Sequence, residues 1–159
     1  MKKHLAWLPA LALLLTLTGC GSIRTSPPAL TVTADSGASV EAMLGTYSWE
    51  YEAGEEWKGI SSDSAHPLWC QEWMPALSAS GEAVTVSAEV APDSITVQCW
   101  SVDNWNAEDI PNGEAVETDG LTFPLKGDGD YVYEVTARWN SAEKWNGTAY
   151  YSFYTEGDG

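Results

Sequence analysis

The sequence predicts an all-β protein whose folded part is a sandwich of two antiparallel sheets. From residue 45 onward, short segments in which apolar and polar residues alternate recur along the chain, as expected of strands with one buried face. Turn-forming residues separate these segments, and none of them has the spacing of a helix longer than one or two turns. Six or seven such strands in about 110 residues suit a two-sheet sandwich.

The N-terminal segment predicts an export signal. Two lysines precede an apolar stretch at residues 5–18, which is too short for a comfortable membrane span and fits the apolar region of a secretory signal. The stretch ends in Leu-Thr-Gly-Cys at residues 17–20, which resembles the lipobox of bacterial lipoproteins. The resemblance implies that residues 1–19 are a signal peptide and that Cys20 is diacylated. The mature chain would then be extracytoplasmic, with its lipid in the cell membrane as the anchor.

Residues 20–42 are predicted to be a lipid-anchored linker. They are rich in Ser, Thr, Ala and Gly, contain Pro27 and Pro28, and show no strong apolar period. We expect an extended segment that lifts the domain off the bilayer, although residues 30–32 alternatively form a short edge strand. The folded domain is then expected at residues 43–156.

The strands are predicted from the alternating segments in chain order. In each, the apolar set faces the core and the polar set faces solvent. The segments cover residues 47–51, 84–90, 95–99, 121–125, 131–139 and 149–154. A tight turn is expected at residues 91–94. Asn146-Gly147 predicts a hairpin between the last two strands, because both residue types accept positive φ, so the chain is expected to turn at residues 145–148.

The start of the segment at 131–139 resembles the entry to the sixth strand of immunoglobulin-like domains. Gly129 stands two residues before Tyr131, as in the arrangement called the tyrosine corner. The resemblance implies an immunoglobulin-like sandwich in which the Tyr131 hydroxyl bonds nearby backbone. Tyr133 occupies the place where antibody domains have their second cysteine, so the usual intersheet disulfide is absent.

The wider pattern combines short aromatic and turn motifs. They are Gly-Thr-Tyr-Ser-Trp at 45–49, His-Pro-Leu at 66–68, Pro-Asp-Ser-Ile-Thr-Val at 92–97 with Trp100, Gly-Asp-Tyr-Val-Tyr-Glu-Val at 129–135 and Gly-Thr-Ala-Tyr-Tyr-Ser-Phe at 147–153. This pattern resembles uncharacterised surface lipoproteins and sensor-attached modules of clostridia-like bacteria. The resemblance implies an immunoglobulin-like domain outside the membrane and brings no established activity.

The charge balance excludes several classes of partner. The chain has 7 Lys and Arg against 23 Asp and Glu, a formal net charge of −16. Removal of residues 1–19 leaves five basic residues against the same 23 acids, a formal charge of −18. DNA, RNA and bare anionic lipid surfaces each require a basic footprint, so we expect no nucleic-acid partner.

Two cysteines remain if Cys20 carries lipid. Cys70 and Cys99 are an even number outside the cytoplasm, where disulfides persist. We expect a bridge between them, which would stabilise the fold by constraining the unfolded chain. The alternative is two buried free thiols, because cysteine is among the most buried residue types.

Tryptophan is the most informative residue type in the chain. Trp49 and Trp139 fall on inward faces of predicted strands. Six others lie in predicted loops or at strand ends, namely Trp57, Trp69, Trp73, Trp100, Trp105 and Trp145. Exposed rings beside carboxylates and amides bind sugars or protein partners, whereas rings that fold back form small local cores. The best candidate patch is Trp100, Asp103, Asn104 and Trp105.

The sequence predicts no catalytic centre, metal site or cofactor. His66 and Cys70 lack a recognisable orienting group for a nucleophile pair, and the adjacent acids at 55–56 and 108–109 are typical of a solvated surface. Asp128 and Asp130 supply two carboxylates where Ca²⁺ needs six or more oxygens.

Together these features favour a binding, interaction or sensory module at the cell envelope, with a protein as its partner. A carbohydrate-binding module that uses loop tryptophans is the alternative, and a small envelope enzyme is the third. The sequence leaves the oligomeric state open.

Overall fold

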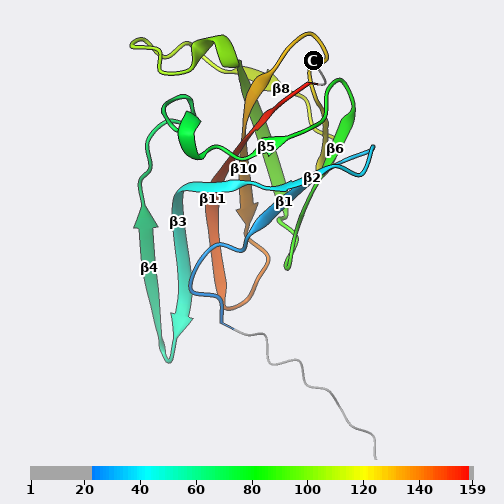
Figure 1. The fold of residues 1–159 in the computed structure, drawn as a ribbon. Coiled ribbons are helices and arrows are strands. Elements are labelled where there is room, and N and C mark those ends of the chain that lie inside the picture. The colour runs from blue at the N-terminus through cyan, green and yellow to red at the C-terminus, as the bar shows by residue number, and fades with distance from the viewer. Residues whose placement is uncertain (1–22, 158–159) are drawn as a thin grey trace, which may run out of the picture.

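The computed structural model describes residues 23–157, which form eleven strands and three single turns of 3-10 helix (Figure 1). The strands are β1 (Leu30–Ala34), β2 (Ser39–Glu41), β3 (Met43–Ala53), β4 (Glu56–Ser62), β5 (Ala76–Leu77), β6 (Ala83–Ala88), β7 (Ser94–Ser101), β8 (Glu114–Val116), β9 (Thr122–Pro124), β10 (Tyr131–Trp139) and β11 (Trp145–Thr155). The helical turns are η1 (Pro67–Trp69), η2 (Gln71–Trp73) and η3 (Val102–Asn104). The predicted all-β class is confirmed. Within residues 23–157, no helix has the length and apolar character needed to span a membrane.

Two sheets enclose the main core. The smaller has the strand order β2-β1-β6-β9, and the larger has the order β4-β3-β11-β10-β7-β8, with β5 added in parallel to β11. All other strand pairs are antiparallel. The chain passes from the smaller to the larger sheet at Ala42, the single residue between β2 and β3. This crossing brings the two sheets into contact at one corner of the sandwich.

A cluster of three tryptophans fills one end of the core. The Trp49 ring is fully buried and stacks on Trp145 at 5.2 Å between ring centroids. Its edge meets Trp139 at 5.5 Å. The inward positions predicted for Trp49 and Trp139 are therefore correct, and Trp145 at the start of β11 belongs to the same cluster.

The last two strands form the predicted hairpin, but the chain turns at a different place. Strands β10 and β11 pair antiparallel, and Asn146 and Gly147 lie within β11, opposite Glu50 and Trp49 of β3. The connection is residues 140–144, where the Asp93 carboxylate accepts two backbone N–H groups. Gly147 has no positive φ, so turn geometry is not the reason for this glycine. The reason is the Trp49 ring, since a Cβ on Gly147 would lie 2.4 Å from Trp49 Cε3.

The tyrosine that bonds backbone is Tyr133, not Tyr131 as the immunoglobulin resemblance implied. The Lys126 backbone N–H donates to the Tyr133 hydroxyl oxygen at 2.7 Å, and the Tyr133 ring is fully buried and stacks on Phe153. Tyr131 instead donates to the Asp128 carboxylate at 3.1 Å. Tyr133 reaches the upstream backbone because it lies on the core face of β10, opposite Cys99 of β7.

The predicted linker at residues 20–42 is largely part of the domain. Strand β1 lies between β2 and β6 rather than at an edge, and its Leu30 and Val32 are fully buried. The preceding residues also pack on the core, because the Trp49 indole N–H donates to the Arg24 carbonyl and the Tyr151 hydroxyl donates to the Pro28 carbonyl. The alternation in Leu-Thr-Val-Thr-Ala was present, but the surrounding Ser- and Pro-rich composition masked it. The predicted signal peptide and Cys20 lie outside the described residues.

Replacing Gly147 by alanine tests the packing around Trp49. The added methyl group would overlap the Trp49 ring and the Ser48 carbonyl, at 2.4 and 2.5 Å, so we expect a loss of about 1–3 kcal/mol in the free energy of unfolding. Urea denaturation measures it. Gly59→Ala is the matched control, since a Cβ there meets nothing within 4 Å. Equal stability of the two variants would contradict the packing argument.

Burial of two tyrosines predicts a loss of stability at alkaline pH. Desolvation raises the pKa of Tyr133 and Tyr151 above the ordinary value of 10. Below pH 10 both residues are protonated in the folded and the unfolded chain. Above about pH 10 the unfolded chain loses these protons first, so the free energy of unfolding falls as pH rises. Urea midpoints measured from pH 8 to pH 11 should decline, and less so in Tyr133→Phe. A flat profile would count against this account.

Candidate functional site

The patch predicted at Trp100, Asp103, Asn104 and Trp105 is not an exposed binding surface. Trp100 is only 5% exposed, and its indole N–H donates to the Pro111 carbonyl at 2.9 Å. Trp105 is half-buried, with its ring edge-on to Tyr154. Asn104 donates to the Ser101 carbonyl, while Asp103 is exposed. The rings fold back as a local core, the alternative weighed from the sequence.

This local core lies on the outer face of the larger sheet. Strand alternation places Trp100 and Val132, which are paired across β7 and β10, on the face opposite the main core. The segment that contains η1 and η2 contributes Leu68, Cys70 and Met74 to the same cluster. We call it the outer cluster. It holds the loop at residues 63–75 and the loop at 102–113 against the sheet.

Cys70 and Cys99 are both free in the structure, so the predicted disulfide is not formed. Cys99 is adjacent to Trp100 in β7 and points the opposite way, into the main core. Cys70 packs with Trp100 in the outer cluster. The sheet therefore separates the two sulfur atoms. Both thiols are buried, and desolvation raises the pKa of each.

The His66 and Cys70 side chains do not form a nucleophile pair. The Cys70 thiol lies 3.5 Å from the His66 carbonyl oxygen rather than from the imidazole. The imidazole Nδ1 accepts the Leu68 backbone N–H, and the ring packs edge-on against Trp100. Burial lowers the His66 pKa, opposed by the nearby Glu134 carboxylate. His66 thus caps η1, a structural role.

The acidic turn at residues 127–130 does not gather its carboxylates into one site. Asp128 accepts from the Tyr131 hydroxyl, whereas Asp130 accepts from the Gly157 backbone N–H. Among residues 23–157 no group of three or more His, Cys, Asp or Glu side chains could hold a metal ion.

Two of the three exposed tryptophans within residues 23–157 lie on the loop that the outer cluster holds, and the third, Trp57, lies on β4. Trp73 is 71% exposed and Trp69 is 47% exposed. They alternate along η1 and η2 with Leu68, Cys70 and Met74, which point inward. The sequence predicts a loop for both tryptophans but does not distinguish them from Trp100. The signal was available in this spacing, because the apolar residues at 68, 70 and 74 mark the inner side.

Hydrogen bonds fix this loop to its neighbour. The Trp69 indole N–H donates to the Ala107 carbonyl at 3.0 Å. Asn106 bonds the loop twice, through its backbone N–H to the Leu68 carbonyl and through its amide to the Gln71 side chain. Asn106 has φ 57°, a left-handed conformation that asparagine tolerates better than most residues. These hydrogen bonds therefore hold in place the loop backbone that carries Trp69 and Trp73.

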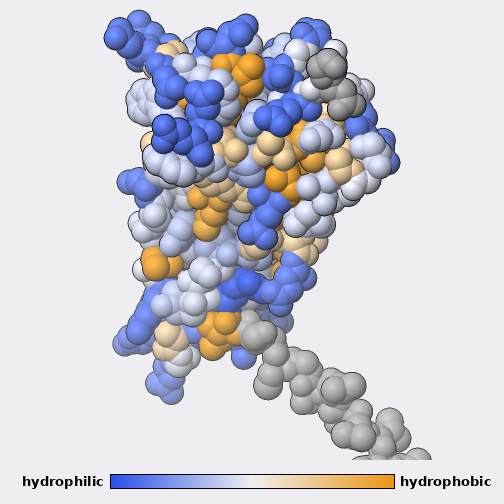
Figure 2. All heavy atoms as spheres, viewed as in Figure 1, coloured by the Kyte–Doolittle hydropathy of each residue, from blue (hydrophilic) through white to orange (hydrophobic). Residues whose placement is uncertain are grey.

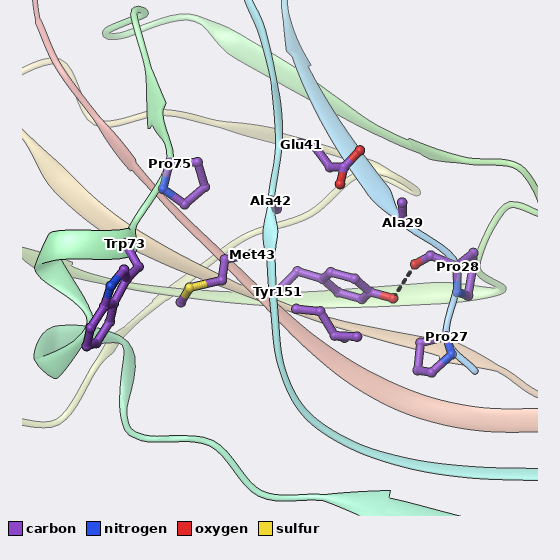
Figure 3. A pocket seen from close by; sticks show the side chains of 10 residues that line it. Pro27, Pro28, Ala29, Glu41, Ala42, Met43, Trp73, Pro75 and Tyr151 are labelled. Carbon is purple, nitrogen blue, oxygen red and sulfur yellow. Dashed lines mark hydrogen bonds between the residues drawn. The ribbon is translucent and has the colours of Figure 1, made fainter.

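An open groove of about 470 Å³ runs beside Trp73 (Figure 3). Trp73 lies at one side and the pair Pro27 and Pro28 at the other, with Met43 and Tyr151 between them. The remaining lining residues lie just before β1, around the crossing between β2 and β3, and just before β5. They are Ala29, Glu41, Ala42, Leu44 and Pro75. Part of this lining was hidden from the sequence analysis, because the two prolines were assigned to the linker.

Most residues that line the groove have apolar side chains, and Glu41 adds one carboxylate, while polar atoms make up nearly half of the exposed lining. Leu44, on its rim, is 41% exposed. Figure 2 shows separate hydrophobic clusters on a largely hydrophilic face of the molecule. One exposed ring, neighbouring apolar side chains and a single carboxylate can bind a ligand by contact and desolvation.

Comparisons with known proteins give no relatives. No family model matches the chain, and no curated protein and no solved structure matches it. The resemblances to bacterial lipoproteins and to immunoglobulin-like domains remain predictions.

The cysteine assignment predicts the chemistry of the purified mature chain carrying Cys20→Ser. Its intact mass should be the same with and without alkylation under non-reducing, native conditions, because both thiols are buried. In denaturant without reductant, both Cys70 and Cys99 should label. A denatured chain that labels only after reduction would show that the bridge exists.

Proposed function

We propose that the protein is a lipid-anchored, non-catalytic binding module of the bacterial cell envelope, whose partner docks at the groove beside Trp73. One observation carries the proposal: the 71% exposed Trp73 ring borders a groove lined mostly by residues with apolar side chains. A large ring in water is unfavourable for a free protein. In complexes, tryptophan is enriched among the residues that supply most of the binding free energy.

The bracing of the loop supports a binding role. The outer cluster and the Asn106 and Trp69 hydrogen bonds hold Trp73 in place before any partner arrives. A preformed site loses less conformational entropy on binding than a mobile one. The opposite wall, Pro27 and Pro28, is also fixed, since Pro28 accepts the Tyr151 hydroxyl.

A protein is the partner that this lining favours. The groove walls are mostly aliphatic, proline and thioether groups, which suit an inserted apolar side chain. The formal net charge of −18 for the mature chain would steer a basic partner toward the surface. A glycan is the second candidate, because the exposed Trp73 ring face and the Glu41 carboxylate share one open groove, and pyranose rings pack on such faces.

The immunoglobulin-like relationship is also part of the proposal. Its support is Tyr133, which lies near the start of β10 and bonds backbone seven residues upstream, in the manner of a tyrosine corner. The anchoring part rests on the signal-like segment that ends in Cys20.

Substitution of Trp73 separates the binding role from a structural one. Trp73→Ala should abolish binding with little change in stability, because the ring is mostly in solvent. In cells, a photo-reactive residue in place of Leu44 on the groove rim should give one discrete cross-linked protein band, absent when Trp73→Ala is added. Trp57→Ala is the control, since Trp57 is also exposed but lies on β4 and does not line the groove.

Titration with peptidoglycan fragments and soluble glycans tests the second candidate. A saturable change in tryptophan fluorescence that persists in Trp57→Ala and disappears in Trp73→Ala would assign a glycan to the groove. If neither a cross-link nor a fluorescence change depends on Trp73, the proposed binding role of the groove is refuted.

A further inference from the structure

Strand β4 is the long exposed edge of the larger sheet. It pairs only with β3, and all seven of its residues are exposed. The strands that end the other sheet edges, β2, β8 and β9, have three residues each. An edge strand presents a row of unpaired backbone N–H and C=O groups, to which another strand can add.

Most of the features that protect an edge strand are absent from β4. Its sequence contains no proline, and its register with β3 runs without a bulge. Two apolar side chains are exposed on its opposite faces, Trp57 at 52% and Ile60 at 44%. Lys58 is its one basic residue, and neither Lys58 nor Glu56 forms an ion pair within residues 23–157.

The turn before β4 fixes which backbone groups point outward. Gly54 and Glu55 form a two-residue connection in which Gly54 has φ 75°, as a type II′ turn requires. Ala53 of β3 and Glu56 of β4 therefore form a hydrogen-bonded pair. Strand alternation then directs the N–H and C=O groups of Trp57, Gly59 and Ser61 away from the sheet.

We propose that β4 pairs antiparallel with β4 of a second copy, about a two-fold axis that passes through Trp57. Trp57 then lies opposite Trp57 of the second copy, on the outer face of a continuous sheet. Lys58 lies opposite Glu56 of the second copy, and Glu56 opposite Lys58, so two pairs of unlike charges form. The isologous contact pairs the outward N–H and C=O groups of the two Trp57 residues, while Gly59 of each copy lies opposite Glu55 in the turn of the other.

Charge selects this register over its neighbours. A two-fold axis at Glu56 would oppose two glutamates, and one at Lys58 would oppose two lysines, which is unfavourable across a strand pair. An axis at Gly59 would place Lys58 opposite Ile60 and would form no pair of unlike charges. Only the axis at Trp57 combines an aromatic pair with complementary charges.

This register also limits repulsion between two acidic chains. It overlaps the ends of the β3–β4 hairpins, which in Figure 1 extend to one end of the molecule, so the bodies lie apart. The contact is short, and we expect a weak dimer with a dissociation constant on the order of 0.1 mM.

Charge reversal tests the pairing in the mature chain with Cys20→Ser, which contains every described residue. Sedimentation equilibrium at concentrations up to about 1 mM should show a monomer–dimer equilibrium. Lys58→Glu and Glu56→Lys should each weaken it at least about tenfold, and the double reversal Glu56→Lys with Lys58→Glu should restore it. A mixture of the two single variants should form heterodimers.

Controls of the same charge change lie nearby. Lys144→Glu and Glu143→Lys alter exposed residues in the β10–β11 connection and should leave the dimer unchanged. All these positions are exposed, so the variants should fold. A wild-type chain that stays monomeric throughout, or a double reversal that does not recover the dimer, would overturn the proposal.

Cysteine cross-linking checks the register independently. Opposed residues in a hydrogen-bonded antiparallel pair have Cα atoms about 5.5 Å apart, a distance that a disulfide spans. Trp57→Cys should therefore oxidise to a disulfide-linked dimer, whereas Gly59→Cys should not, because the axis at Trp57 leaves the two Gly59 residues far from each other. The opposite result would place the axis at Gly59 and refute the register proposed. These outcomes are independent of the Trp73 groove.

Discussion

The burial of the Trp49 indole is the constraint on which much of the structure depends. A buried N–H group must find an acceptor, and the Trp49 N–H finds it in the Arg24 carbonyl, outside the sheets. The ring also requires space on its flank, which Gly147 provides in the adjacent strand. One side chain therefore fixes the path of the N-terminal segment and the residue type allowed in β11.

The same logic explains how the groove is formed. Docking of the N-terminal segment against Trp49 and Tyr151 places the two prolines beside the crossing between the sheets. The outer cluster independently places Trp73 on the other side. The groove thus depends on two packing systems, one on each face of the larger sheet, and neither is sufficient to build it.

The sequence was informative wherever alternation alone determines structure. It predicted the longer central strands, the hairpin of β10 and β11 and the inward faces of Trp49 and Trp139. The prediction was wrong where one residue type can have either of two structural roles that the local sequence does not distinguish. Gly147 follows asparagine, as in a hairpin turn, but serves close packing, and Trp100 lies in an aromatic run typical of a binding patch but is buried beneath a loop.

The remaining errors share a cause, which is that contacts between distant segments are not written in local patterns. Of the two short strands at residues 30–41, β1 pairs with the distant β6 and β2 pairs with β1, whereas composition alone suggested a linker. The disulfide was predicted because an even number of cysteines remains in the mature chain. Adjacent residues of a strand face opposite sides of the sheet, however, so Cys99 points into the main core while Cys70 packs with Trp100 on the other side. Trp73 was recognised as a loop residue, but only the positions of its neighbours distinguish it from the buried rings.

The docked N-terminal segment changes how far the protein can extend from a bilayer. Arg24 is already docked on the domain, and only three residues separate it from Cys20, so an acyl group on Cys20 would lie within roughly 10 Å of chain from that contact. Such a short connection would keep one end of the sandwich close to the lipid headgroups. It would restrict tilting and movement away from the bilayer more than rotation about the membrane normal. Encounters would then occur mainly with molecules moving in or along the same surface. Density of the protein in that plane, rather than its concentration in bulk, would set how often two copies meet.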